Sequence, residues 1–400
     1  MSKYRIVSAD AHILEPPDIW KNWLPDKHQD KAPKLVKDAE GGDAWEFAGS
    51  VQPDPIGLTA TPGMPFDQFR WMGVTYEEAR AGCYNGAERA NDMAFDGVDA
   101  EILFPPQRTV GHFLGDEDDD FVLAGIEAYN NFLFEEFCAP DPTRLVGMAQ
   151  IPSLGIDAAI DGLRKAKARG AKGVVIGNWP AGGDDISEDD DAFWAAAVDE
   201  GMPVTIHILL LSRRARQAQR AAAKKAGGNR LYGGGSAAAR AKTVGGLGSV
   251  FSLVPGHISQ LVFTGVFDRF PELQVVLVEA GIGWIPHFLE MMDDKFWRNR
   301  SWADLPIERP PSDYWRTNLS ATFITDRAGL DLRQRMGVDN IMWSTDYPHH
   351  GNDWPHSRKV IEETMGHIPA GERNKIVAGN AVRLFHLGDE NHGVATLDAR

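Results

Sequence analysis

Asn340-Ile-Met-Trp-Ser-Thr-Asp-Tyr-Pro-His-His350 passes within a few residues from an apolar run into a carboxylate and two imidazoles. The apolar part reads as a buried strand, and Asp346 lies where that strand ends. A carboxylate in such a place is costly to desolvate unless a positive partner meets it. The segment therefore predicts a strand whose end contributes Asp346 to a site that holds a cation.

Three other apolar segments end in the same kind of side chain. They are Arg5-Ile-Val-Ser-Ala-Asp10-Ala-His12, Pro203-Val-Thr-Ile-His207 and Leu273-Gln-Val-Val-Leu-Val-Glu279. Asp10 and His12 are one residue apart, so on an extended backbone both side chains point to the same side and can reach one ion. We therefore predict one metal site built from four strand ends. Mixed imidazole and carboxylate donors suit Zn, Mn or Fe(II) without separating them, and one ion or two remain open.

The order of apolar runs predicts the fold. Eight short runs read as buried strands, at residues 5–9, 100–104, 145–151, 173–176, 204–208, 275–279, 319–323 and 341–345. Amphipathic segments with helical spacing lie between most of them, for example at 156–169 and 357–365. Eight repeats of strand and helix favour a closed parallel (β/α)8 barrel, the TIM barrel of the α/β class, whose chemistry lies at the carboxyl ends of the strands.

An open doubly wound sheet is the alternative fold. It would normally carry a glycine-rich phosphate turn after its first strand. Here the first strand is followed by Asp10-Ala-His12-Ile-Leu-Glu-Pro-Pro, which is no such turn. The barrel is therefore the better interpretation.

We expect residues 1–400 to form a single domain with two segments that exceed the needs of a barrel. Residues 14–84 are rich in Pro, Gly and Trp and are expected to fold as an excursion over the mouth at the carboxyl ends of the strands. Residues 212–249 are rich in Ala, Arg and Gly. They begin shortly after His207, so they could form a lid or an oligomer contact, and a solvated helical insertion is the plainer alternative.

Composition limits the partners. The 400 residues carry a formal net charge of −16, which argues against nucleic acid or an anionic membrane. There are two cysteines, so no disulfide framework is implied. No signal-peptide layout and no run of about 18 apolar residues is evident, so we expect a cytoplasmic protein. The expected partners are a small-molecule substrate and either further copies of the chain or a related subunit.

Further residues are candidates for catalysis or substrate binding. Glu279 could act as a general base or a metal ligand, or could instead stabilise the N-terminus of the helix that follows it. His349 could orient Asp346, bind a second ion or move protons. Arg108 could hold a substrate carboxylate bidentately, although a surface salt bridge is equally plausible. His112 lies just past the second strand and could also face the mouth.

These segments together resemble the amidohydrolase superfamily, in particular the amidohydrolase-related (amidohydrolase 2) branch that includes proteins like aminocarboxymuconate semialdehyde decarboxylase. The resemblance is carried by the segments that contain Asp10-Ala-His12, His207, Glu279 and Ser344-Thr-Asp-Tyr-Pro348, and by Asp96-Gly-Val-Asp-Ala-Glu-Ile-Leu-Phe-Pro105. It implies a (β/α)8 barrel with a divalent metal, often Zn or Mn. It also implies that Asp10, His12, His207 and Asp346 occupy the metal-binding positions.

The chain departs from that branch at two positions. Glu279 stands where the decarboxylases carry a histidine, and His349 stands where an aromatic residue is often found. From these departures we predict a metal-dependent hydrolase that acts on a small carboxylate-bearing or cyclic substrate through metal-activated water. Asp346, Glu279 and His349 would be its catalytic groups. The alternatives are a dinuclear Fe or Mn/Fe oxygenase, in which Glu279 and His349 help to hold the extra ion, and a non-oxidative decarboxylase.

Overall fold

The computed structural model describes residues 4–208, 210–226 and 236–388. Its central feature is a barrel of parallel strands, as predicted, and strands that follow one another in the sequence are neighbours in the barrel. The third strand is interrupted at Met148 and counts as two short pieces. The strands are β1 (Val7–Ala11), β5 (Ala100–Leu103), β6 (Leu145–Gly147) with β7 (Ala149–Gln150), β8 (Val174–Ile176), β9 (Val204–His207), β10 (Val275–Val278), β11 (Leu319–Phe323) and β12 (Ile341–Trp343).

The first and last strands close the barrel through hydrogen bonds at their carboxyl ends. The Thr345 N–H donates to the Ser8 hydroxyl oxygen at 2.8 Å, and the Asp346 N–H donates to the Asp10 carbonyl at 3.0 Å. In return the His12 N–H donates to the Tyr347 carbonyl at 2.6 Å. Barrel closure therefore fixes the backbone of Asp10 and His12 directly beside that of Asp346.

Apolar side chains, many of them Ala, Val or Ile, fill the barrel interior. One buried cluster joins Val7 and Ala9 of β1 to inward-facing residues of other strands, among them Ile102, Val276 and Met342. The pairing of β1 with β5 shifts register between Ser8 and Ala11. Such a shift changes which side chains face inward, and past it Asp10 and His12 face the centre of the barrel.

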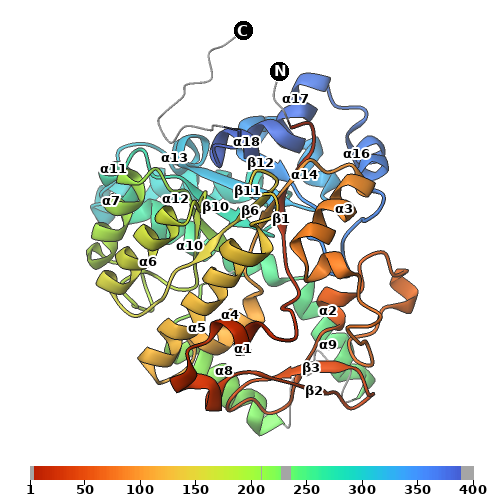
Figure 1. Ribbon diagram of the computed structural model, residues 1–400. Coiled ribbons are helices and arrows are strands. Elements are labelled where there is room, and N and C mark those ends of the chain that lie inside the picture. Colours follow the sequence, from red (N-terminus) through yellow and green to blue (C-terminus); the bar gives the residue numbers. More distant parts are fainter. Residues whose placement is uncertain (1–3, 209, 227–235, 389–400) are drawn as a thin grey trace.

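Helices cover the outside of the barrel (Figure 1). Asn130 shows how one is attached, because its side chain both donates to and accepts from the backbone of Gln150 in β7, at 3.0 Å each way. The helices of eight or more residues, apart from two in the inserted segment, are α3 (Gly86–Asp96), α4 (Gln107–Leu114), α5 (Asp119–Phe132), α6 (Ile156–Ala168), α7 (Asp191–Asp199), α10 (Val254–Phe263), α12 (Ile285–Ala303), α13 (Pro311–Asn318) and α16 (Ser357–Met365). None of the helices in the described ranges combines the length and apolar character that crossing a bilayer requires.

Two segments gather at one end of the barrel, at the bottom of Figure 1. The segment after β1 contains α1 (Ile19–Trp23), α2 (Gly57–Ala60) and an antiparallel sheet of β2 (Lys34–Lys37), β3 (Asp43–Glu46) and β4 (Asp54–Pro55). The segment after β9 contributes α8 (Arg213–Ala226) and α9 (Ala237–Leu247). Part of the predicted insertion, 227–235, lies outside the described residues. The division into one domain with two insertions remains a prediction.

Candidate metal centre and active site

The carboxyl ends of four strands bring six side chains together at one rim of the barrel. They form two groups that share His12, and within each group the donor atoms lie within 4.8 Å of one another. The first group is Asp10, His12, His207 and Glu279, and the second is His12, Asp346 and His349. All six side chains that the sequence marked as possible metal ligands are therefore close together.

The first group has the donor arrangement of a cation site. The Nε2 atoms of His12 and His207 face each other at 3.0 Å, and each lies 3.5 Å from Oδ1 of Asp10. His12 Nδ1 is 3.2 Å from the Phe104 carbonyl, a partner that favours the proton on Nδ1 and leaves the lone pair on Nε2. Both carboxylate oxygens of Asp10 are buried and have no hydrogen-bond partner among the described residues. A cation would supply the missing partner.

Asp346 and His349 form the second part of the site. His349 Nδ1 lies 3.0 Å from Oδ1 of Asp346, and His12 Nε2 lies 3.5 Å from the same oxygen. The rings of His12 and His349 stack with centroids 4.3 Å apart. Burial lowers the pKa of His349 to about 3, so its imidazole is neutral at pH 7. A neutral imidazole beside a carboxyl group can pass a proton to or from it.

Charge in the cluster also favours a cation. Burial, followed by the neighbouring Asp10, raises the pKa of Asp346 well above its usual value. The pKa of Glu279 is also raised well above its usual value, mainly by burial and next by the charge of Asp346. Burial also acts to raise the pKa of Asp10, but the adjacent His207 and His12 outweigh it and hold that pKa low. Three carboxyl groups this close cannot all ionise without a compensating positive charge, and this donor set, with no thiolate, suits Mn, Zn or Fe(II).

The backbone at the strand ends is left-handed at three residues that are not glycine. Ile208, Glu279 and Asp346 have φ values of 63°, 57° and 58°. This conformation is unfavourable for residues with a Cβ and is found where the surroundings impose it, often at functional sites. Here the Glu279 N–H donates to the hydroxyl of Thr322 in β11 at 2.8 Å, which helps to hold the turn. The turns point Glu279 and Asp346 toward the shared rim.

A cavity of about 510 Å³ opens above this cluster, within the usual size range for small-molecule sites. Trp45, Phe47 and Trp71 contribute aromatic wall to it, and all three come from the excursion after β1. Arg108 also lines the cavity and lowers the pKa of His349 through its charge, which places its guanidinium near the cluster. The sequence did not indicate the aromatic wall, because it depends on how a distant segment folds back.

His112 does not reach the cluster. Its Nε2 lies 3.0 Å from Asp54, its ring stacks on Phe47 with centroids 3.9 Å apart, and it lines a neighbouring cavity. A residue that we had not predicted lines the main cavity instead. Glu15 is buried there, accepts a hydrogen bond from the Thr109 hydroxyl, and has a pKa raised by burial. The sequence did offer a signal for Glu15, because the segment Glu15-Pro-Pro follows Asp10 and His12 closely at the end of the first strand.

Comparison with known proteins assigns the family. The family model described as amidohydrolase matches residues 82–387, which is most of the chain. The chain belongs to the amidohydrolase family. This confirms the resemblance that the sequence motifs predicted, and it makes the protein an enzyme of the amidohydrolase superfamily.

One relative by sequence and two solved structures show which members of the superfamily this chain is similar to. A gamma-resorcylate decarboxylase from Polaromonas sp. is 31% identical over 135 residues, a match that spans 33% of this chain and 40% of that protein. The structure of an amidohydrolase from Mycobacterium avium subsp. paratuberculosis superimposes with a TM-score of 0.71 at 18% identity, over 96% of this chain and all of that one. The structure of a dihydroxybenzoic acid decarboxylase from Polaromonas sp. was solved with bound manganese and the inhibitor 2-nitroresorcinol. It superimposes with a TM-score of 0.61 at 18% identity, over 96% of this chain and 97% of that one. The structural likenesses confirm the barrel fold.

The hydrolase prediction is contradicted by these comparisons. The curated relative is named a decarboxylase, and so is one of the two structural neighbours. The prediction was wrong because it took Glu279, in place of a histidine, as evidence against decarboxylation. A site of imidazoles and carboxylates that binds a cation does not by itself fix the reaction, since the same ion can activate water or orient an organic anion.

Proposed function

We propose that this amidohydrolase is a metal-dependent, non-oxidative decarboxylase of an aromatic carboxylic acid. The observation that carries the proposal is the cluster of Asp10, His12, His207 and Glu279 at the floor of a cavity with aromatic walls. The relatives named above support it, since decarboxylases are among them.

The metal would be held by the first group of side chains. Asp10, His12, His207 and Glu279 supply two carboxylates and two imidazoles within reach of one point, a set that suits a divalent cation such as Mn²⁺. When bound, the cation supplies an anchor and an electron-withdrawing charge for the oxygen atoms of the substrate. The buried, unpartnered oxygens of Asp10 are the structural reason for placing it there.

The remaining residues suit the binding of a flat, anionic molecule. Trp45 and Trp71 provide apolar surface in the cavity. The aromatic ring of a substrate can stack on such side chains while the carboxylate on its edge stays free to bind elsewhere. Arg108 can hold a carboxylate through two parallel hydrogen bonds. The cavity therefore fits a ring that carries a carboxylate at one end.

Asp346 is the proposed proton donor. In the reaction its proton would pass to the ring carbon that bears the carboxylate, so that a C–H bond forms as the C–C bond breaks. The electron pair of the broken bond stays with the ring, and CO2 leaves. Burial already favours the protonated form of Asp346 in the cluster, and His349, 3.0 Å away, is placed to return a proton to it from solvent.

The test uses the protein loaded with Mn²⁺ and gamma-resorcylate in D2O. We expect release of CO2 and formation of resorcinol that carries one deuterium on the vacated carbon, as measured by mass spectrometry. A panel of hydroxybenzoates and 5-carboxyvanillate extends the search for the substrate. Hydrolysis of an ester or lactone panel by the same preparation, with no CO2 from any aromatic acid, would contradict the proposal.

A further inference from the structure

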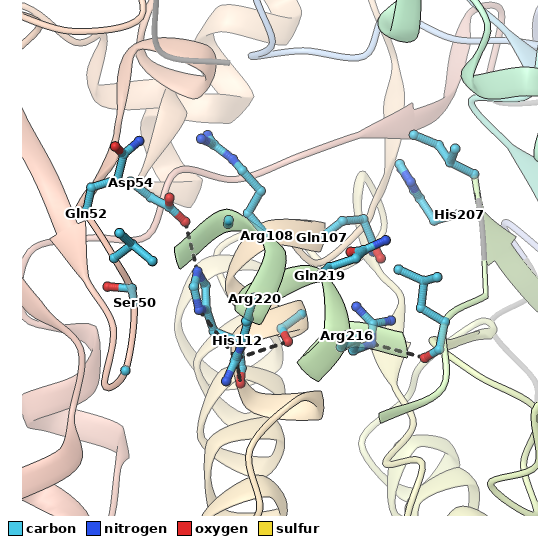
Figure 2. A pocket seen from close by; sticks show the side chains of 16 residues that line it. Ser50, Gln52, Asp54, Gln107, Arg108, His112, His207, Arg216, Gln219 and Arg220 are labelled. Carbon is cyan, nitrogen blue, oxygen red and sulfur yellow. Dashed lines mark hydrogen bonds and ion pairs between the residues drawn. The ribbon is translucent and has the colours of Figure 1, made fainter. Parts of the chain in front are cut away.

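A second cavity adjoins the first. It has a volume of about 480 Å³, and the two cavities share Asp54, Gln107, Arg108, His207 and Ile208 among their lining residues. We call it the annexe. Figure 2 shows Asp54 and His207 on opposite sides of it, with side chains of α4 and α8 between them. A substrate bound at the metal centre can therefore extend into the annexe without leaving the protein.

The annexe is cationic in a protein that is strongly acidic. Three arginines line it, Arg108, Arg216 and Arg220, against one carboxylate, Asp54. That carboxylate already faces His112 at 3.0 Å. In a chain with a net charge of −16, such a local excess of positive charge attracts anions to this position.

Helix α8 presents two kinds of arginine. Arg213 and Arg214 each have a carboxylate partner, Asp119 and Asp184 respectively. Arg216 and Arg220, four residues apart and hence on one face of the helix, line the annexe. Neither of these two forms an ion pair with a carboxylate among the described residues.

Within the described part of the chain, the contacts of Arg216 leave its charge without a counter-ion. Its Nε donates to the Leu211 carbonyl at 3.1 Å and its Nη2 to the Gly177 carbonyl at 2.8 Å. Arg220 likewise donates to backbone carbonyls, including that of His112. Such contacts can anchor a helix, but a carbonyl dipole does not neutralise a guanidinium. Burial, and then Arg220, lower the pKa of Arg216 only to about 10, so it stays charged at neutral pH.

We propose that the annexe is an anion subsite of the active site, so that the substrate carries a second anionic group remote from the carboxylate that reacts. Arg216 and Arg220 would bind that group, either a carboxylate or a phosphate, since guanidinium groups match both. The proposal rests on the proposed function, because it names the substrate class of the same site.

The test compares ligands that differ only in the second charge. Binding to the Mn²⁺-loaded protein is measured by calorimetry for 4-(2-carboxyethyl)benzoate, for 4-(2-phosphonoethyl)benzoate, and for 4-propylbenzoate, which keeps the ring carboxylate but lacks the second anionic group. We expect the two ligands with a second anionic group to bind about tenfold or more tightly than 4-propylbenzoate, because charge-assisted hydrogen bonds contribute that much. The tighter of these two ligands identifies the preferred group. No turnover is needed, so this result is independent of whether the protein decarboxylates gamma-resorcylate.

Variants separate charge recognition from helix anchoring. Arg216→Gln should remove most of the preference for the doubly anionic ligands and leave the affinity for 4-propylbenzoate within about twofold, whereas loss of an anchor would weaken all three ligands alike. Arg220→Gln serves as the second variant if Arg216→Gln does not fold. Arg214→Gln, on the outer face of the same helix, should keep the preference. Equal affinity of the unaltered protein for ligands with and without the second anionic group, or a preference that survives both annexe variants, would overturn the proposal.

Discussion

Asp346 lies between two imidazoles, with His349 Nδ1 at 3.0 Å and His12 Nε2 at 3.5 Å from its Oδ1. Its amide variant keeps the shape of the side chain but can neither hold nor donate the proton. We predict that Asp346→Asn lowers kcat for decarboxylation by about 10²- to 10⁴-fold, the usual contribution of a general acid. The measurement is steady-state CO2 release with metal content determined on the same sample. Asp331→Asn, at an exposed position, is the matched control and should keep full activity.

The sequence identifies candidate metal ligands, but it does not predict the backbone conformation that positions them. Asp10, His12, His207 and Asp346 each end an apolar run, and that is a local pattern visible in the sequence. The left-handed turn at Glu279 depends on the hydroxyl of Thr322, 43 residues further along the chain. Contacts of this kind arise only when the strands are side by side, so no local pattern reports them.

A buried ion pair links helix α3 to strand β5 and to the loop after β1. Arg89 donates to Glu101 at 2.8 Å, to the His12 carbonyl at 2.6 Å and to the Gly82 carbonyl at 2.7 Å. We predict that Arg89→Met lowers the free energy of unfolding by about 3–5 kcal/mol, because it leaves Glu101 buried and unpaired. Denaturant unfolding followed by circular dichroism measures it.

The double variant Arg89→Met with Glu101→Leu is the companion experiment. It leaves no buried charge, so it should recover more than half of the lost stability. Arg298→Met, which breaks an exposed pair with Asp294, is the control and should cause no comparable loss. A double variant no more stable than the single one would show that the charge of Glu101 is not the cause.

Strands and helices were largely predictable because each barrel strand is a short apolar run between amphipathic segments. Residues 319–323 coincide with β11, whereas β1 begins two residues later than predicted. The break of the third strand at Met148 was missed. There the strand changes partners, since β6 pairs with β5 and β7 pairs with β8, and hydrophobicity alone does not record such a change.

Over the whole molecule, metal binding should be coupled to folding, because the proposed ligands come from three strands, β1, β9 and β10, that lie far apart in the sequence. We predict that Mn²⁺ at 100 times its dissociation constant adds about 2.7 kcal/mol to the free energy of unfolding of the metal-free protein. Unfolding with and without the ion measures this gain. Asp10→Asn should remove most of it, whereas His367→Gln, at an exposed histidine, should not. An equal gain in all three proteins would place the ion elsewhere.

The barrel as a whole could be predicted, but the shape of its active site could not. Trp45, Phe47 and Trp71 come from the excursion, and Arg216 and Arg220 come from the inserted helix. Both segments lack the repeating pattern of the barrel, so their positions follow from packing onto it. This is why the candidate ligands were visible in the sequence while the reaction was misjudged.

The proposed metal site can be tested with a crystal grown with Mn²⁺ and measured at the manganese absorption edge. We expect an anomalous peak bounded by Asp10, His12 and His207, with Glu279 within bonding distance. If the protein binds Mn²⁺ in solution but its crystals show no peak at this rim, or show the peak among other residues, the metal site proposed at the strand ends is wrong.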